Sequence, residues 1–164
     1  MRTASRPNLP RPALLKPGDR LPDVRLQRVD GPLLPLIRFR QRRNLVIVLL
    51  GPGVSAPGQA LLEELARARP AIQAETAELL AVTTAPPQQA GELTRRLGLP
   101  LLTDPDGMLH RAALGPEISS ERTPSVLVVD RYGEIYAVLR PDPAPPRVAD
   151  ILEWLRFIEL QCPE

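Results

Sequence analysis

Residues 45–65 read LVIVLLGPGVSAPGQALLEEL, and this stretch determines the fold class. Its first six residues, Leu45–Leu50, are apolar without a break, as in a strand that is buried on both faces in the middle of a sheet. The next segment, Gly51–Gly58, contains three glycines and two prolines and is expected to be a loop. A helix should begin near Gln59, because apolar residues then recur at helical spacing as far as Ile72. We expect Pro70 to kink or end this helix.

The rest of the chain alternates strands with helices. Strand–helix–strand segments give parallel strand pairs, and hairpins give antiparallel ones. The predicted fold class is therefore α/β, with a mixed central β-sheet, helices on both faces and an N-terminal β-hairpin extension. The three most apolar runs, at 45–50, 79–82 and 126–129, should be neighbouring central strands. The other expected elements are strands at Val24–Val29, Leu34–Phe39 and Ile135–Leu139, and helices at Pro87–Leu97, through Leu109 and Ala113, and from Val148 to Ile158.

The composition limits the range of functions. The chain has 164 residues, enough for one domain, and a formal net charge of +2. Its basic residues form no stripe interleaved with aromatic residues, which argues against nucleic-acid binding. No apolar run approaches the ~20 residues that span a bilayer, and the N-terminus lacks the apolar core of a signal peptide. We therefore expect a cytoplasmic protein that binds neither nucleic acid nor a membrane.

Two parts are expected along the chain. Residues 1–14 are rich in proline and arginine and show no periodicity, so we expect a flexible tail. Residues 15–164 should form the single domain. The only cysteine is Cys162, which excludes an intrachain disulfide and a cysteine-cluster metal site. We expect no cofactor and no bound metal.

Three motifs resemble those of the peroxiredoxin (AhpC/TSA) and TlpA-like thioredoxin families. The first is LKPGDRLPDVRL at 15–26, followed by Asp30-Gly31; the second is LLTDPDG at 101–107; the third is TPSVLVVDRYG at 123–133. They stand in the family's order and spacing over roughly residues 15–160. The resemblance implies a thioredoxin-like fold, with a cis peptide bond before Pro124 and with Pro124 beside the active site.

The resemblance also places the family's active site at the start of the first long helix. Family members have Cys-x-Pro-Cys or a Thr-x-x-Cys variant there, and the helix N-terminus lowers the pKa of the thiol. This chain has Ser55-Ala56-Pro57-Gly58 instead, with Ser55 in the place of the first cysteine and Gly58 in that of the second. A hydroxyl without an activating base does not replace a thiolate, and it cannot cycle through sulfenic acid or a disulfide. The degenerate site formed by Ser55, Pro57, Gly58 and Pro124 should therefore lack redox chemistry.

The only histidine, His110, has two interpretations. In one, it activates Ser55 as in a hydrolase dyad. In the other, which we favour, Ser55 is a helix N-cap or a loop hydroxyl, and His110 is an exposed or partly packed residue of a short surface helix.

Two sets of charged residues also have both a chemical and a structural interpretation. Asp104 and Asp106 lie in a turn with proline and glycine, and we interpret them as turn formers and not as metal ligands. Arg38 and Arg40 would share one face of a strand. They could bind an anion there, but we favour a solvated strand edge that resists aggregation.

Two functions follow from these observations. The first is a redox-inactive binding module, with a protein partner or a small ligand at the face formed by Ser55 and Pro124. The second is an AhpC/TSA-family oxidoreductase with peroxidase or thiol–disulfide activity, in which Cys162 or a partner's thiol supplies the sulfur. A structural subunit of a homo-oligomer is a third possibility.

Replacing Ser55 by cysteine tests the expected site. A helix N-terminus stabilises a thiolate, so the new thiol in Ser55→Cys should titrate below the ~8.5 of a free cysteine. The measurement is the pH dependence of thiolate absorbance in a Cys162→Ser background. A normal or raised pKa would contradict the survival of the family's site geometry.

Overall fold

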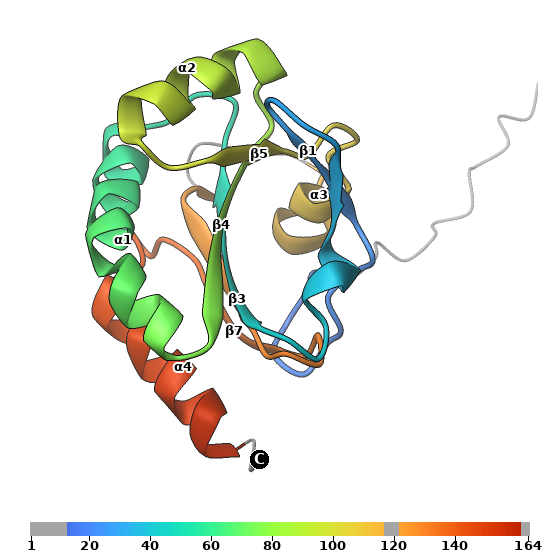
Figure 1. Ribbon diagram of the computed structural model, residues 1–164, viewed down its shortest axis with the longest axis vertical. Helices are drawn as coiled ribbons and strands as arrows, with labels where there is room; N and C mark the ends of the chain where they lie inside the picture. The colour runs from blue at the N-terminus through green and yellow to red at the C-terminus, as the bar shows by residue number, and fades with distance from the viewer. Residues whose placement is uncertain (1–12, 117–121, 162–164) are drawn as a thin grey trace, which may run out of the picture.

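The described residues form a seven-stranded mixed sheet with helices on both faces (Figure 1). The computed structural model describes residues 13–116 and 122–161, so residues 1–12 of the predicted tail and Cys162 lie outside the described residues. The strand order is β2-β1-β5-β4-β3-β6-β7. The strands are β1 (Arg25–Arg28), β2 (Leu33–Pro35), β3 (Asn44–Leu50), β4 (Ala77–Thr83), β5 (Leu101–Thr103), β6 (Ser125–Val129) and β7 (Ile135–Leu139).

β3 lies in the interior of the sheet, between β4 and β6, and all seven of its residues are buried. β4 pairs with β3 in parallel, and β6 pairs with it antiparallel on the other side. The apolar runs at 79–82 and 126–129 are buried along their whole length. The prediction that the three most apolar runs are neighbouring central strands is therefore confirmed.

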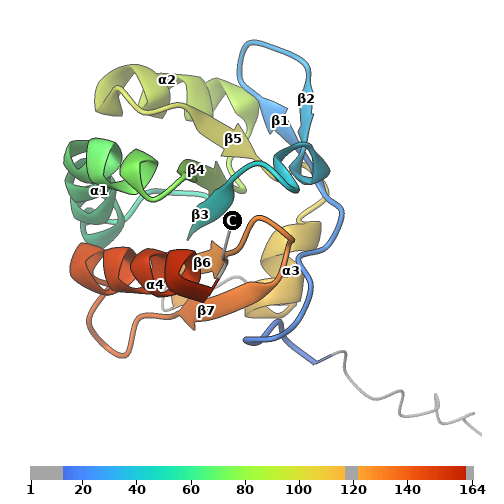
Figure 2. The same cartoon turned by 60° about the horizontal axis from the view of Figure 1, so that its bottom comes forward.

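Helices cover both faces of the sheet and divide the interior into two apolar cores. On one face lie α1 (Ala56–Ala74), α2 (Pro87–Leu97) and α4 (Val148–Gln161) (Figure 2). The opposite face is covered by α3 (Met108–Leu114) and by a 3-10 helix, η1 (Leu36–Phe39).

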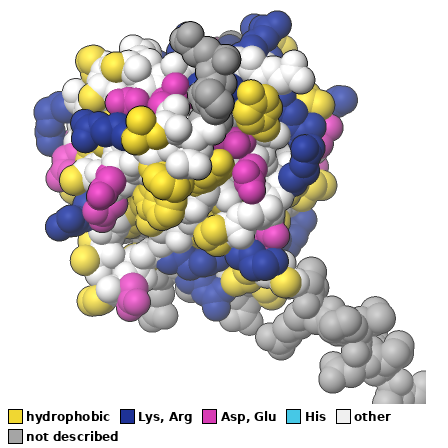
Figure 3. Space-filling view, turned by 90° about the horizontal axis from the view of Figure 1, so that it is seen from below, with side chains coloured by type: hydrophobic (Ala, Val, Ile, Leu, Met, Phe, Trp, Pro, Cys, Tyr) yellow, Lys and Arg dark blue, Asp and Glu magenta, His cyan; other side chains and the backbone are white. Residues whose placement is uncertain are grey.

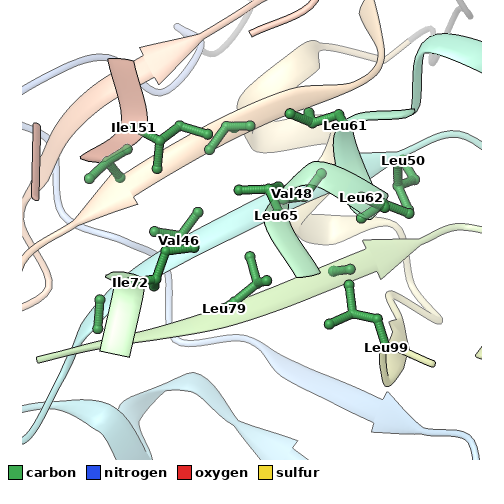
Figure 4. Packing of buried hydrophobic residues seen from close by; sticks show 14 of the residues in the cluster. Val46, Val48, Leu50, Leu61, Leu62, Leu65, Ile72, Leu79, Leu99 and Ile151 are labelled. Carbon is green, nitrogen blue, oxygen red and sulfur yellow. The ribbon is translucent and has the colours of Figure 1, made fainter. Parts of the chain in front are cut away.

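Alternate residues of β3 enter the two cores, as the period of a strand requires. Val46 and Val48 point from β3 toward α1, where they lie near Leu65 and Ile72 (Figure 4). Ile47 belongs to the core on the opposite face, with the buried residues of α3. The strand is thus apolar throughout because neither of its faces meets water.

A polar cluster holds the amino end of β3. The buried Asn44 donates from Nδ2 to the carbonyl oxygen of Glu75 at 3.1 Å and to Oε1 of Glu159 at 2.6 Å. Arg131 donates to the same Glu159 oxygen from Nη2, also at 2.6 Å. Because Glu159 lies on α4, this cluster joins the last helix to the start of the central strand.

Two strand predictions are wrong. The predicted strand Leu34–Phe39 ends at Pro35, which has no N–H for a longer ladder, and the chain then turns into η1. Arg38 and Arg40 therefore do not share a strand face. The segment Leu101–Thr103, where we predicted no strand, is β5, which fills the position between β1 and β4.

The predicted bounds of the first long helix are also wrong. Helix α1 begins at Ala56, three residues before Gln59, because Ser55 caps it. It continues through Pro70 to Ala74, although a proline inside a helix removes a hydrogen bond. We attribute this continuity to the fully buried Ile72, which anchors the last turn in the core. Tertiary packing here outweighs a local preference.

Candidate functional site

The predicted site, with Ser55, Pro57 and Gly58, lies where β3 ends and α1 begins, outside the carboxyl end of β3. The loop between them is held at its first residue, Gly51. Its carbonyl oxygen accepts a hydrogen bond from Oγ1 of Thr83 at 2.8 Å, and the same hydroxyl accepts one from the backbone N–H of Ala85 at 3.0 Å. Pro52 and Gly53, which follow, are exposed. The loop thus has a fixed base and an exposed tip.

Ser55 caps α1, as expected. Its Oγ accepts a hydrogen bond from the backbone N–H of Gly58 at 3.2 Å, and its carbonyl oxygen accepts one from the N–H of Gln59 at 2.9 Å. Pro57 has no N–H to offer. The serine hydroxyl and the first turn of the helix therefore satisfy each other, which leaves few N–H groups at this end for an anion.

Gly58 occupies a small buried space beside the cap. A Cβ at this position would lie 3.2 Å from Oγ of Ser55 and 3.5 Å from side-chain carbons of Leu50 and Val54. The last two distances are ordinary contacts, and the first requires a shift of a few tenths of an ångström. A Cβ therefore fits at this position if the Ser55 hydroxyl shifts slightly.

The Thr123–Pro124 peptide bond is cis, which confirms the expectation drawn from the family. The next residue, Ser125, begins β6 opposite Leu49 of β3. Thr123 lies against the loop, because a Cβ on Gly51 would be 3.5 Å from its Oγ1. The proline and the loop thus share one end of the sheet, while direct contact between Pro124 and Ser55 stays a prediction.

His110 is fully buried, so the prediction that it is exposed or partly packed is wrong. Its Nε2 lies 2.9 Å from the carbonyl oxygen of Leu50, the last residue of β3. Its Nδ1 lies 3.0 Å from Oδ2 of Asp104, which also accepts the His110 backbone N–H at 3.0 Å. A carbonyl oxygen only accepts hydrogen bonds, so the contact with Leu50 places a proton on Nε2. His110 and Asp104 form a buried hydrogen-bonded pair under the loop.

Asp104 is ionised in this pair. Burial alone would raise the pKa of its carboxyl group, but the hydrogen bonds from the His110 side chain and backbone outweigh burial and lower the pKa below its ordinary value. Asp104 also shapes the turn, since its carbonyl oxygen accepts from the Gly107 N–H at 3.0 Å. The interpretation of Asp104 as a turn former therefore describes only part of its role.

The Ser55–His110 dyad does not form. Both ring nitrogens of His110 are bonded to other groups, and the Ser55 hydroxyl is bonded to the helix. The sequence held a signal for the burial of His110: on a helix it shares a face with Ala113 and Leu114, and a carboxylate stands in the turn before it. That signal shows burial, but not that the partner is a carbonyl of a strand sixty residues away.

Two arginines bind carbonyl oxygens at the C-terminus of α3. Arg122 donates from Nη1 to the carbonyl oxygen of Leu114, and Arg140 donates from Nη2 to that of Ala113 at 3.0 Å. Burial, and next the nearby charge of Arg122, lower the pKa of Arg140. Positive charge at a helix C-terminus is favourable. These contacts direct Arg122 to the end of α3.

In residues 13–116 and 122–161 no three His, Cys, Asp or Glu side chains are grouped so that they could hold a metal ion. Within the same ranges, no helix is long and apolar enough to cross a membrane. On the face seen from below, basic side chains lie mostly around the rim and mix with acidic and hydrophobic ones (Figure 3).

Comparisons with known proteins identify the fold. No family model and no curated protein sequence matches the chain. Solved structures do match: peroxidoxin BcpB from Mycobacterium tuberculosis has a TM-score of 0.73 at 20% identity, over 88% of this chain and 98% of that one. A mutant of PrxQ from Xylella fastidiosa has a TM-score of 0.73 at 18% identity, with the same coverage. The reduced 2-Cys peroxiredoxin of Plasmodium vivax has a TM-score of 0.72 at 14% identity, over 88% and 82%.

The buried pair predicts an acid-sensitive stability that Asp104→Asn removes. The native pKa of Asp104 is lowered, so its contribution to folding is complete above the ordinary value of about 4 and is lost as the pH falls through the lower native value. Leaving one partner of a buried hydrogen-bonded pair unsatisfied costs about 1–3 kcal/mol, and more where the pair is charged. Urea unfolding between neutral and acidic pH should show Asp104→Asn far less stable near neutrality, with a gap to the wild type that narrows on acidification.

Asp106→Asn is the matched control, because Asp106 lies in the same turn and is exposed. It should unfold like the wild type at every pH. An equal loss in both variants would show that the His110 pair does not anchor the turn.

Proposed function

We propose that this chain, which has a peroxiredoxin-like thioredoxin fold, is a redox-inactive binding module that holds a partner at the face formed by the Ser55 loop and Pro124. One observation carries the proposal: the loop at the carboxyl end of β3 is anchored at its base, yet it contains no thiol. The partner is a protein or a small ligand. Association of copies of this chain through the same face belongs to the same proposal.

The groups at the site support the absence of redox turnover. Gly58 has no side chain, and the Ser55 hydroxyl accepts a hydrogen bond from the helix that it caps. The only histidine, which might have served as a base, is held between Leu50 and Asp104. A peroxidase needs a sulfur that attacks and is then regenerated, and neither Ser55 nor Gly58 supplies one.

The same groups favour binding. Thr83 holds the carbonyl of Gly51, and His110 holds that of Leu50, so two successive carbonyls at the base of the loop are fixed. Pro52, at the exposed tip, has a restricted backbone. A loop that is already ordered loses little conformational entropy when it binds. A fixed base beneath an exposed tip is thus an arrangement suited to recognition.

The alternative is an oxidoreductase that uses Cys162 or a thiol from a partner. The likeness of the fold to peroxiredoxins favours it. In that reaction the thiolate attacks one oxygen of the peroxide, the O–O bond breaks, the sulfur is oxidised to sulfenic acid, and water or an alcohol leaves. Cys162 lies outside the described residues, so its relation to the loop is a matter for experiment.

A peroxide assay separates the two functions. The reduced protein should consume hydrogen peroxide no faster than buffer after at most one equivalent, because the loop holds no sulfur to recycle. Peroxide consumption is followed with an excess of thiol reductant, for the wild type and for Cys162→Ser. Sustained turnover that disappears in Cys162→Ser would establish the oxidoreductase and refute the proposal.

A charged side chain at the loop tip tests the binding role. Pro52→Arg should abolish co-purification of whatever associates with the wild type, since it adds bulk and charge to the proposed face. Gln73→Arg is the control, because Gln73 is exposed near the far end of α1. Retention of the partner by Pro52→Arg, or its equal loss from both variants, would contradict the proposal. The measurement is quantitative mass spectrometry of the purified material.

A further inference from the structure

The amino end of β4 has a bare edge inside the sheet. β3 pairs with β4 along the whole of Ala77–Thr83. β5, on the other side, pairs only with Ala81–Thr83. Within the described part of the chain, no strand lies beside Ala77–Leu80 on the β5 side. This edge is at the opposite end of β4 from the Ser55 loop.

The backbone groups of Ala77 and Leu79 face this bare side. The carbonyl oxygen of Thr76 accepts the N–H of Asn44 at 2.9 Å and so faces β3. The carbonyl oxygen of Thr83 accepts the N–H of Asp104 at 3.1 Å and so faces the β5 side. Successive residues of a strand alternate in direction. Alternation from Thr76 to Thr83 therefore places the backbone N–H and carbonyl groups of Ala77 and Leu79 on the side where no described strand lies.

Pro100 stops β5 from covering the edge. Leu101 stands opposite Ala81, and in that parallel register the N–H of residue 100 would meet the carbonyl oxygen of Leu79. Proline has no N–H, so the ladder ends there. The track that a longer β5 would follow is open beside the first half of β4.

A groove of about 480 Å³ occupies this track. Glu78, Leu79 and Leu80 line it from β4, and Val29 lines it from the chain after β1. Its volume is within the usual range for a binding pocket. At 3.3 Å per residue, an extended segment of three to four residues would run alongside Ala77–Leu80.

The charges of the groove favour an acidic occupant. Arg28, Arg38 and Arg69 line it, and none of them takes part in an ion pair within the described ranges. Asp30 and Glu78 also line it, so positive charge exceeds negative charge by one. Guanidinium groups bind carboxylates by paired hydrogen bonds. The apolar residues between them would accept aliphatic side chains.

We propose that this groove binds a short, extended, acidic segment of a partner protein, which adds a strand beside β4. Backbone hydrogen bonds to Ala77 and Leu79 supply part of the affinity, and the three arginines select carboxylate side chains. Residues 1–12 of this chain do not match the groove, because they include three arginines, three prolines and no acidic residue.

A capped hexapeptide of alternating glutamate and valine is the probe. It should bind with a dissociation constant below about 1 mM, and its lysine–valine counterpart should not. Arg28→Gln combined with Arg38→Gln should weaken binding by about tenfold or more. Arg25→Gln combined with Arg67→Gln is the matched control, because both arginines are exposed and lie outside the groove.

Two further measurements test the strand itself. Hydrogen exchange of the Leu79 N–H should slow on binding, whereas that of Leu80, which faces β3, should not change. A peptide methylated on its backbone nitrogens should bind weakly. Pro100→Val supplies the missing N–H, so β5 can extend along the same edge of β4, and this variant should bind the peptide more weakly than the wild type does. Absence of glutamate–valine binding, equal binding of the lysine peptide, or an unaltered Leu79 exchange rate with bound peptide would each overturn the proposal.

Discussion

Complete burial of β3 is the constraint on which the rest of the structure depends. A strand without a polar residue between its ends needs apolar cover on both faces, and two separate cores provide it. Because the strand is buried, polar side chains of the described residues contact its backbone only near its two ends. At the carboxyl end, the carbonyl of Leu50 is hydrogen-bonded to His110, and the adjacent carbonyl of Gly51 is hydrogen-bonded to Thr83. These hydrogen bonds hold the base of the loop that contains Ser55.

The residues of the predicted site have a defined arrangement although none of them carries a thiol. The cap made by Ser55, the space at Gly58 and the cis bond at Pro124 are all scaffold features, and none of them requires a thiol. The buried pair of His110 and Asp104 under the loop takes two polar side chains out of water. From these contacts we infer that the base of the loop is held in one position. That inference agrees with a role in binding, where geometry alone is sufficient.

Much of the fold could be predicted from local patterns, and the failures have specific causes. Unbroken apolar runs identified β3, β4 and β6, because burial on both faces leaves a direct signature in the sequence. The three-residue strand β5 has no such signature in the sequence, because it is a strand only through its pairing with β1 and β4. Pro70 does not end α1, and we attribute this to the burial of Ile72, which outweighs a local helix preference. At the site, Ser55 was interpreted correctly as a cap, but His110 was not, because its carbonyl partner is distant in sequence.

The two polar attachments of β3 have a consequence for how the domain opens. Asn44 joins one end of the strand to Glu159 on the last helix, and the carbonyl of Leu50 joins the other end to α3 through His110. Fraying normally starts at strand ends, where hydrogen bonds are few. Here each end is tied to a helix on a different face of the sheet, so β3 cannot peel away from either end alone. We therefore expect β3 to open only when both helix layers separate from the sheet.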